Sequence, residues 1–145
     1  MLIFLRWSLV MVYFEREFYA NPDRDDLNRL WWEVVGEVQK VRPPARVQER
    51  HDWATKIHLA TAPVYYHNYL LGELQASQFA AFISANVLAD GSGGRMAYVG
   101  RPEVGEYLRE RVFAPGAVLD WNGLSQHATG KPLGPEGFVL EFVGE

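Results

Sequence analysis

The sequence predicts a mainly α fold, a multi-helix bundle formed by one domain that spans residues 1–145. Apolar residues recur at intervals of three and four in several long stretches, which is the spacing of amphipathic helices. Proline and glycine, with 8 and 13 copies, stand between those stretches, where they end helices. No alternating pattern of useful length indicates a strand. The length and the 48% hydrophobic share are those of a domain with its own core.

The first part of the chain contains two predicted helices. Residues 2–19 are apolar nearly all round, so we expect this helix to be buried on several sides. Asn21-Pro22-Asp23 ends it and supplies a cap for an amphipathic helix that reaches Lys40, with Asp25 and Asp26 in its first turn. The apolar face of the second helix is formed by Leu27, Leu30, Trp31, Val34, Val35 and Val38.

The rest of the chain predicts one long helix and three shorter ones. Residues 45–52 are charged and loop-like, and residues 53–59 form a short turn or strand. Thr61 as cap and Pro63 in the first turn then open the longest helix, which ends at Asn86. After a flexible loop at Asp90–Gly94, the shorter helices are 102–112, 121–129 closed by Gly130, and one that starts at Pro135 with Phe138, Val139 and Phe142 facing inward.

The N-terminal stretch has the composition of a signal peptide but not its organisation. Residues 1–14 are mostly apolar, yet Arg6 interrupts a run that is too short to span a bilayer, and Glu15-Arg16-Glu17 follows at once. We therefore expect a buried helix and no membrane as partner. Chain ends are normally polar and frayed, so an apolar helix that starts almost at Met1 suggests the C-terminal part of a larger protein.

The charge balance and the absence of cysteine exclude several classes of function. A net charge of −4 provides no polybasic surface, so nucleic acid and anionic membranes are not expected partners. Zero cysteines exclude a disulfide scaffold, a thiolate metal site and a cysteine nucleophile. They also fit a reducing, cytoplasmic location.

Common catalytic motifs are missing from the sequence. The 4 histidines are His51, His58, His67 and His127; no two lie four positions apart and HExxH does not occur, so we expect no complete zinc site within the chain. Ser92 and Ser125 lie in no GxSxG elbow. Gly130-Lys131 has neither the spacing nor the hydroxyl residue of a phosphate-binding loop.

The strongest candidate site comprises Lys56, His58, Tyr65, Tyr66 and Tyr69. Taken singly, each histidine or tyrosine is best explained as a core residue whose polar atom finds a partner. Taken together, so many polar aromatic residues near one helix start favour the wall of a binding cleft. An imidazole can donate to a substrate carbonyl, a lysine can pair with a carboxylate, and a tyrosine hydroxyl can donate to an oxyanion. These are auxiliary tasks in peptide-bond hydrolysis.

An ordered series of short motifs resembles a known enzyme family over most of the chain. The series comprises Leu30-Trp31-Trp32, Pro43-Pro44, the stretch from Asp52 to Phe82, Asp120-Trp121, Ala128-Thr129-Gly130-Lys131-Pro132 and the final helix from Phe138 to Val143. Its strongest local signature is Lys56-Ile57-His58 with Tyr65 seven residues after the histidine. The series resembles the C-terminal portion of the HExxH zinc metallopeptidases related to angiotensin-converting enzyme, thimet oligopeptidase and oligoendopeptidase F, which implies a zincin-like all-helical fold.

The resemblance implies a substrate-binding role for three residues. In the angiotensin-converting relatives, the residues that match Lys56 and Tyr65 hold the carboxylate at the substrate's C-terminus. The residue that matches His58 hydrogen-bonds a substrate backbone carbonyl. The arginine that binds chloride in some relatives corresponds to His67, so chloride activation is not implied for this chain.

The resemblance also implies a catalytic tyrosine. In the relatives, a tyrosine ten positions after the matching histidine stabilises the tetrahedral intermediate. This chain has Asn68 at that position, so the role passes to Tyr66 or Tyr69, assisted by His58. In helical geometry Tyr65 and Tyr69 share a face, and Tyr66 and Tyr69 nearly do.

The zinc-binding motif of the family does not occur in the 145 residues. By resemblance, the chain is the substrate-binding, cleft-lining C-terminal region of a zinc-dependent peptidase, either a peptidyl-dipeptidase (dipeptidyl carboxypeptidase) or an oligopeptidase. Zinc would belong to the full-length parent, and the expected partners are a peptide substrate and the N-terminal zinc-bearing part of the enzyme. Alone, the chain should bind no catalytic zinc and cleave nothing. The alternative is a non-enzymatic helical module that binds a peptide or partner helix, or self-associates through the apolar helix 2–19.

Overall fold

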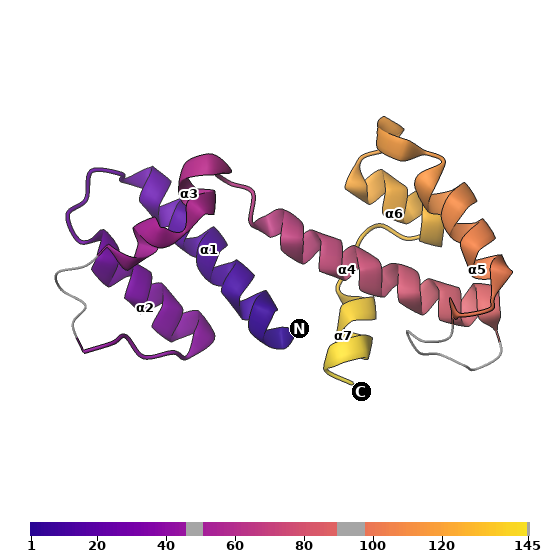
Figure 1. Cartoon of the computed structure of the whole chain (residues 1–145), viewed down its shortest axis with the longest axis horizontal. Helices are drawn as coiled ribbons and strands as arrows, with labels where there is room; N and C mark the ends of the chain where they lie inside the picture. Colours follow the sequence, from indigo (N-terminus) through magenta and orange to yellow (C-terminus); the bar gives the residue numbers. More distant parts are fainter. Residues whose placement is uncertain (46–50, 90–97, 145) are drawn as a thin grey trace. The chain divides into compact units, whose positions relative to one another are not determined.

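The computed structural model describes residues 1–45, 51–89 and 98–144, and its regular elements are all helical (Figure 1). The α-helices of the described part are α1 (Leu2–Ala20), α2 (Leu27–Gln39), α3 (Ile57–Thr61), α4 (His67–Phe82), α5 (Pro102–Tyr107), α6 (Trp121–Thr129) and α7 (Glu136–Phe142). It also contains the 3₁₀ helices η1 (Asp52–Thr55) and η5 (Gly116–Val118) and the π-helices η2 (Ile83–Leu88) and η4 (Leu108–Phe113). The mainly α prediction is confirmed, and the predicted loop at Asp90–Gly94 lies outside the described residues.

The chain forms two compact units, which we call unit 1 (Met1–Leu71) and unit 2 (Gly72–Glu145). Each unit has its own apolar core, and the single domain that the sequence predicts stays a prediction. The strongly apolar faces of the first two helices bury each other. The core of unit 1 is therefore completed without residues from the second half of the chain.

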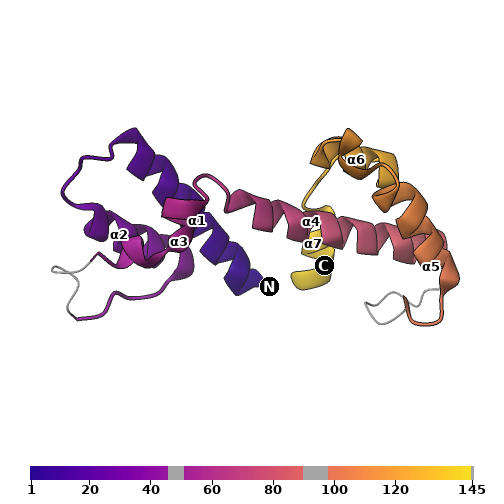
Figure 2. The ribbon, with the colours of Figure 1, turned by 45° about the horizontal axis from the view of Figure 1, so that its top comes forward.

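In unit 1, α1 and α2 lie side by side (Figures 1 and 2). Val10, Met11 and Phe14 of α1 are fully buried and pack against Trp31 of α2, which is 2% exposed. The Trp31 ring meets the Phe14 ring edge-on, with 5.1 Å between centroids. Burial does not extend all round α1, because Ile3 is 81% exposed. No helix in the described residues is long and apolar enough to cross a membrane.

The start of α2 differs from the sequence prediction. Asp25 and Asp26 do not lie in its first turn, because the helix begins at Leu27 with Asp26 as the N-cap residue. The Asp26 carboxylate accepts hydrogen bonds from the Arg24 and Arg29 guanidinium groups, which hold the pKa of Asp26 well below its usual range. Ion pairs thus take the place of the expected side-chain cap.

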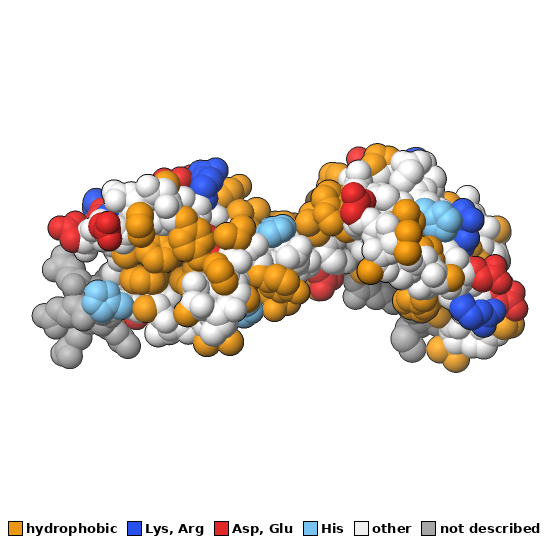
Figure 3. Space-filling model, turned by 90° about the horizontal axis from the view of Figure 1, so that it is seen from above, with side chains coloured by type: hydrophobic (Ala, Val, Ile, Leu, Met, Phe, Trp, Pro, Cys, Tyr) orange, Lys and Arg blue, Asp and Glu red, His pale blue; other side chains and the backbone are white. Residues whose placement is uncertain are grey.

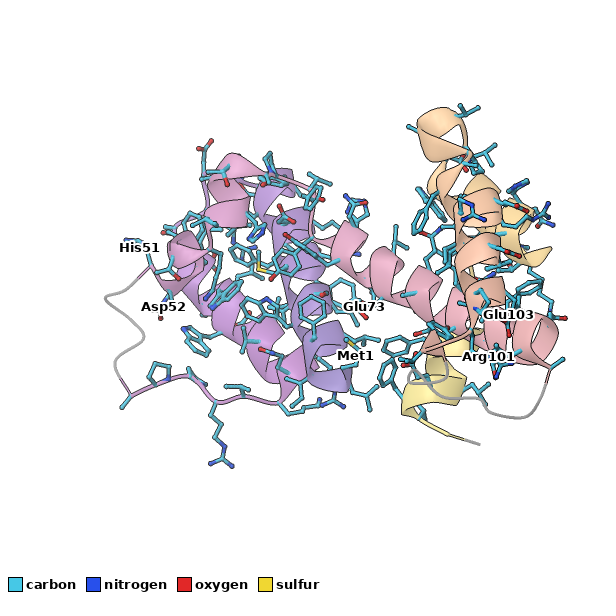
Figure 4. All side chains as sticks on the ribbon, turned by 45° about the vertical axis from the view of Figure 1, so that its right-hand side comes forward. Met1, His51, Asp52, Glu73, Arg101 and Glu103 are labelled. Carbon is cyan, nitrogen blue, oxygen red and sulfur yellow. The ribbon has the colours of Figure 1, made fainter. Side chains whose placement is uncertain are left out.

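The segment ahead of α3 is the short helix η1 rather than an irregular turn or a strand. Asp52, labelled at the start of η1 in Figure 4, ties this helix to α2. Its carboxylate accepts from Trp32 Nε1 at 2.9 Å, and its backbone N–H donates to Asn28 Oδ1 at 2.8 Å. These bonds fix the stretch that leads into Lys56 and His58.

In unit 2, a core of Ile83, Leu88 and Val104 forms where η2 meets α5. The backbone of α7 packs directly on α4, because a Cβ added at Gly137 would lie 2.9 Å from backbone atoms of Gln78. A glycine at this position is therefore required by the close approach of the two helices.

Several helix ends in unit 2 match the sequence prediction. α5 begins at Pro102, beside the Arg101–Glu103 ion pair labelled in Figure 4. α6 spans 121–129 and is closed by Gly130 at φ 77°. The prediction that Val139 faces inward is wrong, since this side chain is 44% exposed. Phe138 is buried, at 3% exposed, and the half-buried Phe142 ring lies against it at 4.7 Å.

Candidate functional site

The candidate residues lie on the turn between α3 and α4 in unit 1 and on the ends of these two helices. The sequence prediction that Thr61 and Pro63 open the long helix is wrong. Thr61 is the last residue of α3, and α4 begins only at His67. Val64 has a φ of 55°, which a right-handed helix cannot contain. Tyr65 and Tyr66 consequently lie in the turn before α4.

Four predicted site residues form one group of touching rings, which we call the tyrosine cluster: His58, Tyr65, Tyr66 and Tyr69. The imidazole centroid lies 4.9 Å from that of Tyr66 and 5.8 Å from that of Tyr69. The Tyr69 ring lies 5.1 Å from Tyr66 and 5.5 Å from Tyr65, each edge-on. His58 Nε2 and the Tyr69 hydroxyl share a hydrogen bond of 3.2 Å. Tyr65 and Tyr69 are 46% and 40% exposed, so the cluster has an accessible edge.

Two residues of α1, Trp7 and Phe4, contact the tyrosine cluster. Trp7 Nε1 donates to the Tyr66 hydroxyl at 2.6 Å, and the two rings are edge-on at 6.3 Å. Phe4, one helical turn earlier, meets the Tyr69 ring at 6.3 Å. The sequence analysis missed both residues. Their spacing of three in an apolar helix was an available signal, as was the need of a partly buried indole N–H for an acceptor.

Lys56 joins the cluster through aromatic faces rather than through a hydrogen bond. Its ammonium lies 5.1 Å from the ring centroid of Trp7 and 5.9 Å from that of Trp31, within the range of cation–π attraction. Among the described residues, no hydrogen bond links Lys56 to Tyr65. The expected carboxylate-binding pair is therefore not in direct contact, and the ammonium keeps its donors for a ligand.

A buried carboxylate lies directly behind the turn. Glu15 of α1 is 4% exposed, and its Oε1 accepts from the Val64 backbone N–H at 2.8 Å and from the Tyr19 hydroxyl at 3.2 Å. Burial and this neighbouring carboxylate raise the pKa of Tyr19. In the sequence, Glu15 is one of the charged residues that follow the apolar stretch and was interpreted as an ordinary solvated charge, which its burial contradicts.

A cavity in unit 2 has a volume of about 750 Å³, and its lining includes residues of α4 and of the segment from Thr129 to Gly137. Gln78 is one of the polar residues that line this cavity. Its amide nitrogen donates to Thr129 Oγ1 and to the Lys131 and Pro132 carbonyls, and its amide oxygen accepts from the Gly134 N–H. The amide is thus already satisfied by the protein, which favours a structural role.

In the described residues, no group of three or more His, Asp or Glu side chains is placed to hold a metal ion. Comparison of the chain with protein-family models, with curated proteins and with solved structures finds no match.

Proposed function

We propose that Lys56 and the tyrosine cluster bind a peptide, as the substrate-binding region of a zinc-dependent peptidase. The supporting observation is the continuous set of contacts that runs from Lys56 through Trp7 to the cluster. It links a cation, an imidazole and three phenols, of which Tyr65 and Tyr69 are exposed. Such a set can bind a carboxylate, a carbonyl and an oxyanion along one extended chain.

The contacts support a division of roles. Lys56 and Tyr65 bind the peptide's C-terminal carboxylate, and His58 binds a backbone carbonyl. Because the Tyr66 oxygen accepts from Trp7 Nε1, its own proton is free to be donated to an oxyanion. Tyr69 shares a hydrogen bond with His58 and is the other candidate for that role.

The zinc and the base that activates water would come from a segment that carries HExxH, which this chain lacks. The isolated chain is then a binding unit and not a hydrolase. Peptide hydrolysis by the isolated chain with stoichiometric zinc would contradict this part of the proposal.

Calorimetric titration with trialanine tests the proposal, using the peptide with a free or an amidated C-terminus. Amidation should weaken binding by about tenfold, because it removes a charge-assisted hydrogen bond. Lys56→Met should weaken binding of the free acid by the same factor and leave binding of the amide unchanged. The variant removes the ammonium that pairs with the peptide carboxylate. Tyr65→Phe should act in the same direction.

Tyr13→Phe is the matched control, since Tyr13 is an exposed phenol on α1 whose described contact is with Arg16. It should leave both affinities unchanged. Equal binding of the acid and the amide, or no binding of either, would refute carboxylate recognition at this site.

The alternative function, a non-enzymatic helical module, is favoured by the apolar side chains that remain accessible in unit 1. Figure 3 shows hydrophobic side chains gathered on one face of this unit, and Leu2 and Ile3 at the start of α1 are 45% and 81% exposed. If the exposed start of α1 binds a second copy of the chain, sedimentation should show a dimer that Ile3→Glu dissociates. A monomer that binds trialanine more tightly as the free acid than as the amide would favour the proposed role in a peptidase.

A further inference from the structure

Val64 has a backbone conformation that its own side chain does not favour. Its φ of 55° lies in the left-handed region, where a β-branched residue is an outlier. The side chain is 62% exposed, so burial of its methyl groups does not hold it there. Such strain persists only where surrounding structure imposes it, and it often accompanies functional sites.

The Val64 backbone N–H donates to the Glu15 carboxylate at 2.8 Å. Glu15 lies in the buried face of α1 next to Phe14. A backbone hydrogen bond to a carboxylate is among the stronger ones, and a buried carboxylate deprived of its donors is costly. Both effects favour the conformation that points the Val64 N–H into unit 1.

We propose that Glu15 is a positioning residue for the tyrosine cluster, acting through the conformation of Val64. Val64 directly precedes Tyr65 and Tyr66, so its backbone angles set the direction in which both phenols leave the turn. Release of Val64 would turn the Tyr66 hydroxyl away from Trp7 Nε1, its present donor. This inference rests on the proposed function for its effect on peptide binding, but not for its effect on the turn.

The first test measures hydrogen exchange of the Val64 amide in the full chain. Glu15→Ala should speed exchange by about tenfold or more, because the amide loses its acceptor. Glu15→Gln keeps an oxygen at the same place and should restore most of the protection. Glu17→Ala is the matched control, since Glu17 lies on the same helix and is paired with the exposed Arg16; it should leave exchange unchanged.

The second test measures trialanine binding by calorimetry. Glu15→Ala should weaken binding by roughly threefold to tenfold, the factor of one hydrogen bond. Adding Val64→Gly should restore much of this loss, because glycine adopts a positive φ without the Glu15 restraint. Val64→Ala should not restore it. A merely structural defect at position 15 would not be repaired by a glycine in the turn.

Tyr19→Phe separates the two hydrogen bonds that Glu15 accepts. It removes the hydroxyl donor but leaves the Val64 bond, so peptide affinity should stay within about twofold of the wild type. A loss equal to that of Glu15→Ala would assign the effect to the whole buried network and overturn the proposal.

The outcomes distinguish failure of this inference from failure of the proposed function. If the wild type does not bind trialanine, the proposed function and the role in binding both fail, while hydrogen exchange still decides whether Glu15 holds the turn. If the wild type binds but Glu15→Ala binds equally well, or if exchange at Val64 is unchanged, the positioning role is refuted.

Discussion

The polar side chains of unit 2 and those of the tyrosine cluster in unit 1 have different hydrogen-bond partners. In unit 2 the polar side chains mainly bind backbone: Gln78 holds two carbonyls and an N–H of the segment after α6, and the Tyr107 hydroxyl donates to the Ala128 carbonyl at 2.9 Å. In the tyrosine cluster of unit 1 they bind one another, as in Trp7 with Tyr66 and His58 with Tyr69. Those pairs lie near an accessible edge.

This difference distinguishes polar side chains that stabilise the fold from polar side chains that can bind a ligand. A side chain that binds backbone fixes a loop and has its hydrogen-bonding capacity used up. A hydroxyl that only accepts from an indole still has its proton to give. The tyrosine cluster retains such capacity, whereas Gln78 in the cavity wall of unit 2 does not. Variants in the two units should therefore affect different properties, namely stability in unit 2 and binding in unit 1.

The largest expected effect on stability is in unit 2, where the contact between α7 and α4 is made by backbone. Gly137→Ala places a methyl group 2.9 Å from Gln78 backbone atoms, so the helices must separate, at a cost of about 1–3 kcal/mol. Urea unfolding measures this. Gly105→Ala in α5 is the control, since its Cβ meets nothing within 4 Å. It should stabilise by roughly 0.5–1 kcal/mol. Equal effects of the two variants would contradict the close contact.

Gln78→Ala should cost about 1–3 kcal/mol of unfolding free energy, because the Gly134 N–H and the Pro132 carbonyl lose the hydrogen bonds that Gln78 makes to them. Gln126→Ala is a milder change at an exposed glutamine that donates to a single carbonyl, that of Gly130. It should cost about 0.5–1.5 kcal/mol. If Gln78→Ala instead left stability intact, the cavity beside it would become the stronger candidate for a ligand site.

Unit 1 offers a matched pair of tyrosine variants. Tyr66→Phe removes the acceptor of the Trp7 N–H and should cost about 1 kcal/mol in urea unfolding. The Tyr65 hydroxyl makes no hydrogen bond to the described residues, so Tyr65→Phe should change stability by less than about 0.5 kcal/mol. Both should nevertheless weaken trialanine binding. A Tyr65→Phe variant that lost stability but kept its affinity for trialanine would contradict the expectation that variants in unit 1 affect binding.

The sequence was sufficient for the fold class, but not for the geometry of the candidate site, and the contacts of Trp7 and Phe4 with the tyrosine cluster were not predicted from it. Apolar spacing located α1 and α2, and proline and glycine located the ends of α5 and α6, because these signals are local. The helix start at His67 was missed because a cap-like Thr61 and Pro63 suggested an earlier start. The competing signal was a hydrogen bond to Glu15, 49 residues away in the chain, which no local pattern contains.

The same limit applies to Lys56 and to the division into two units. Lysine chemistry predicts a carboxylate ligand, but it does not predict that the ammonium lies over the indoles of Trp7 and Trp31. That placement depends on how α1 packs on α2. The two separate cores likewise depend on which apolar faces bury each other, and a list of apolar positions does not specify this.

The smallest expected effect concerns alkaline pH and compares one tyrosine from each unit. Burial raises the pKa of Tyr107, and burial together with Glu15 raises that of Tyr19, whereas an unfolded tyrosine titrates near a pKa of about 10. The folded state thus holds these protons more tightly. The resulting stability is fully present below pH about 10 and is lost as the pH rises through the raised pKa values.

Tyr19→Phe and Tyr107→Phe should each flatten the fall in unfolding free energy above pH about 10. Because the Tyr19 shift also depends on the carboxylate, Glu15→Gln should reduce the slope attributed to Tyr19 and leave that of Tyr107 unchanged.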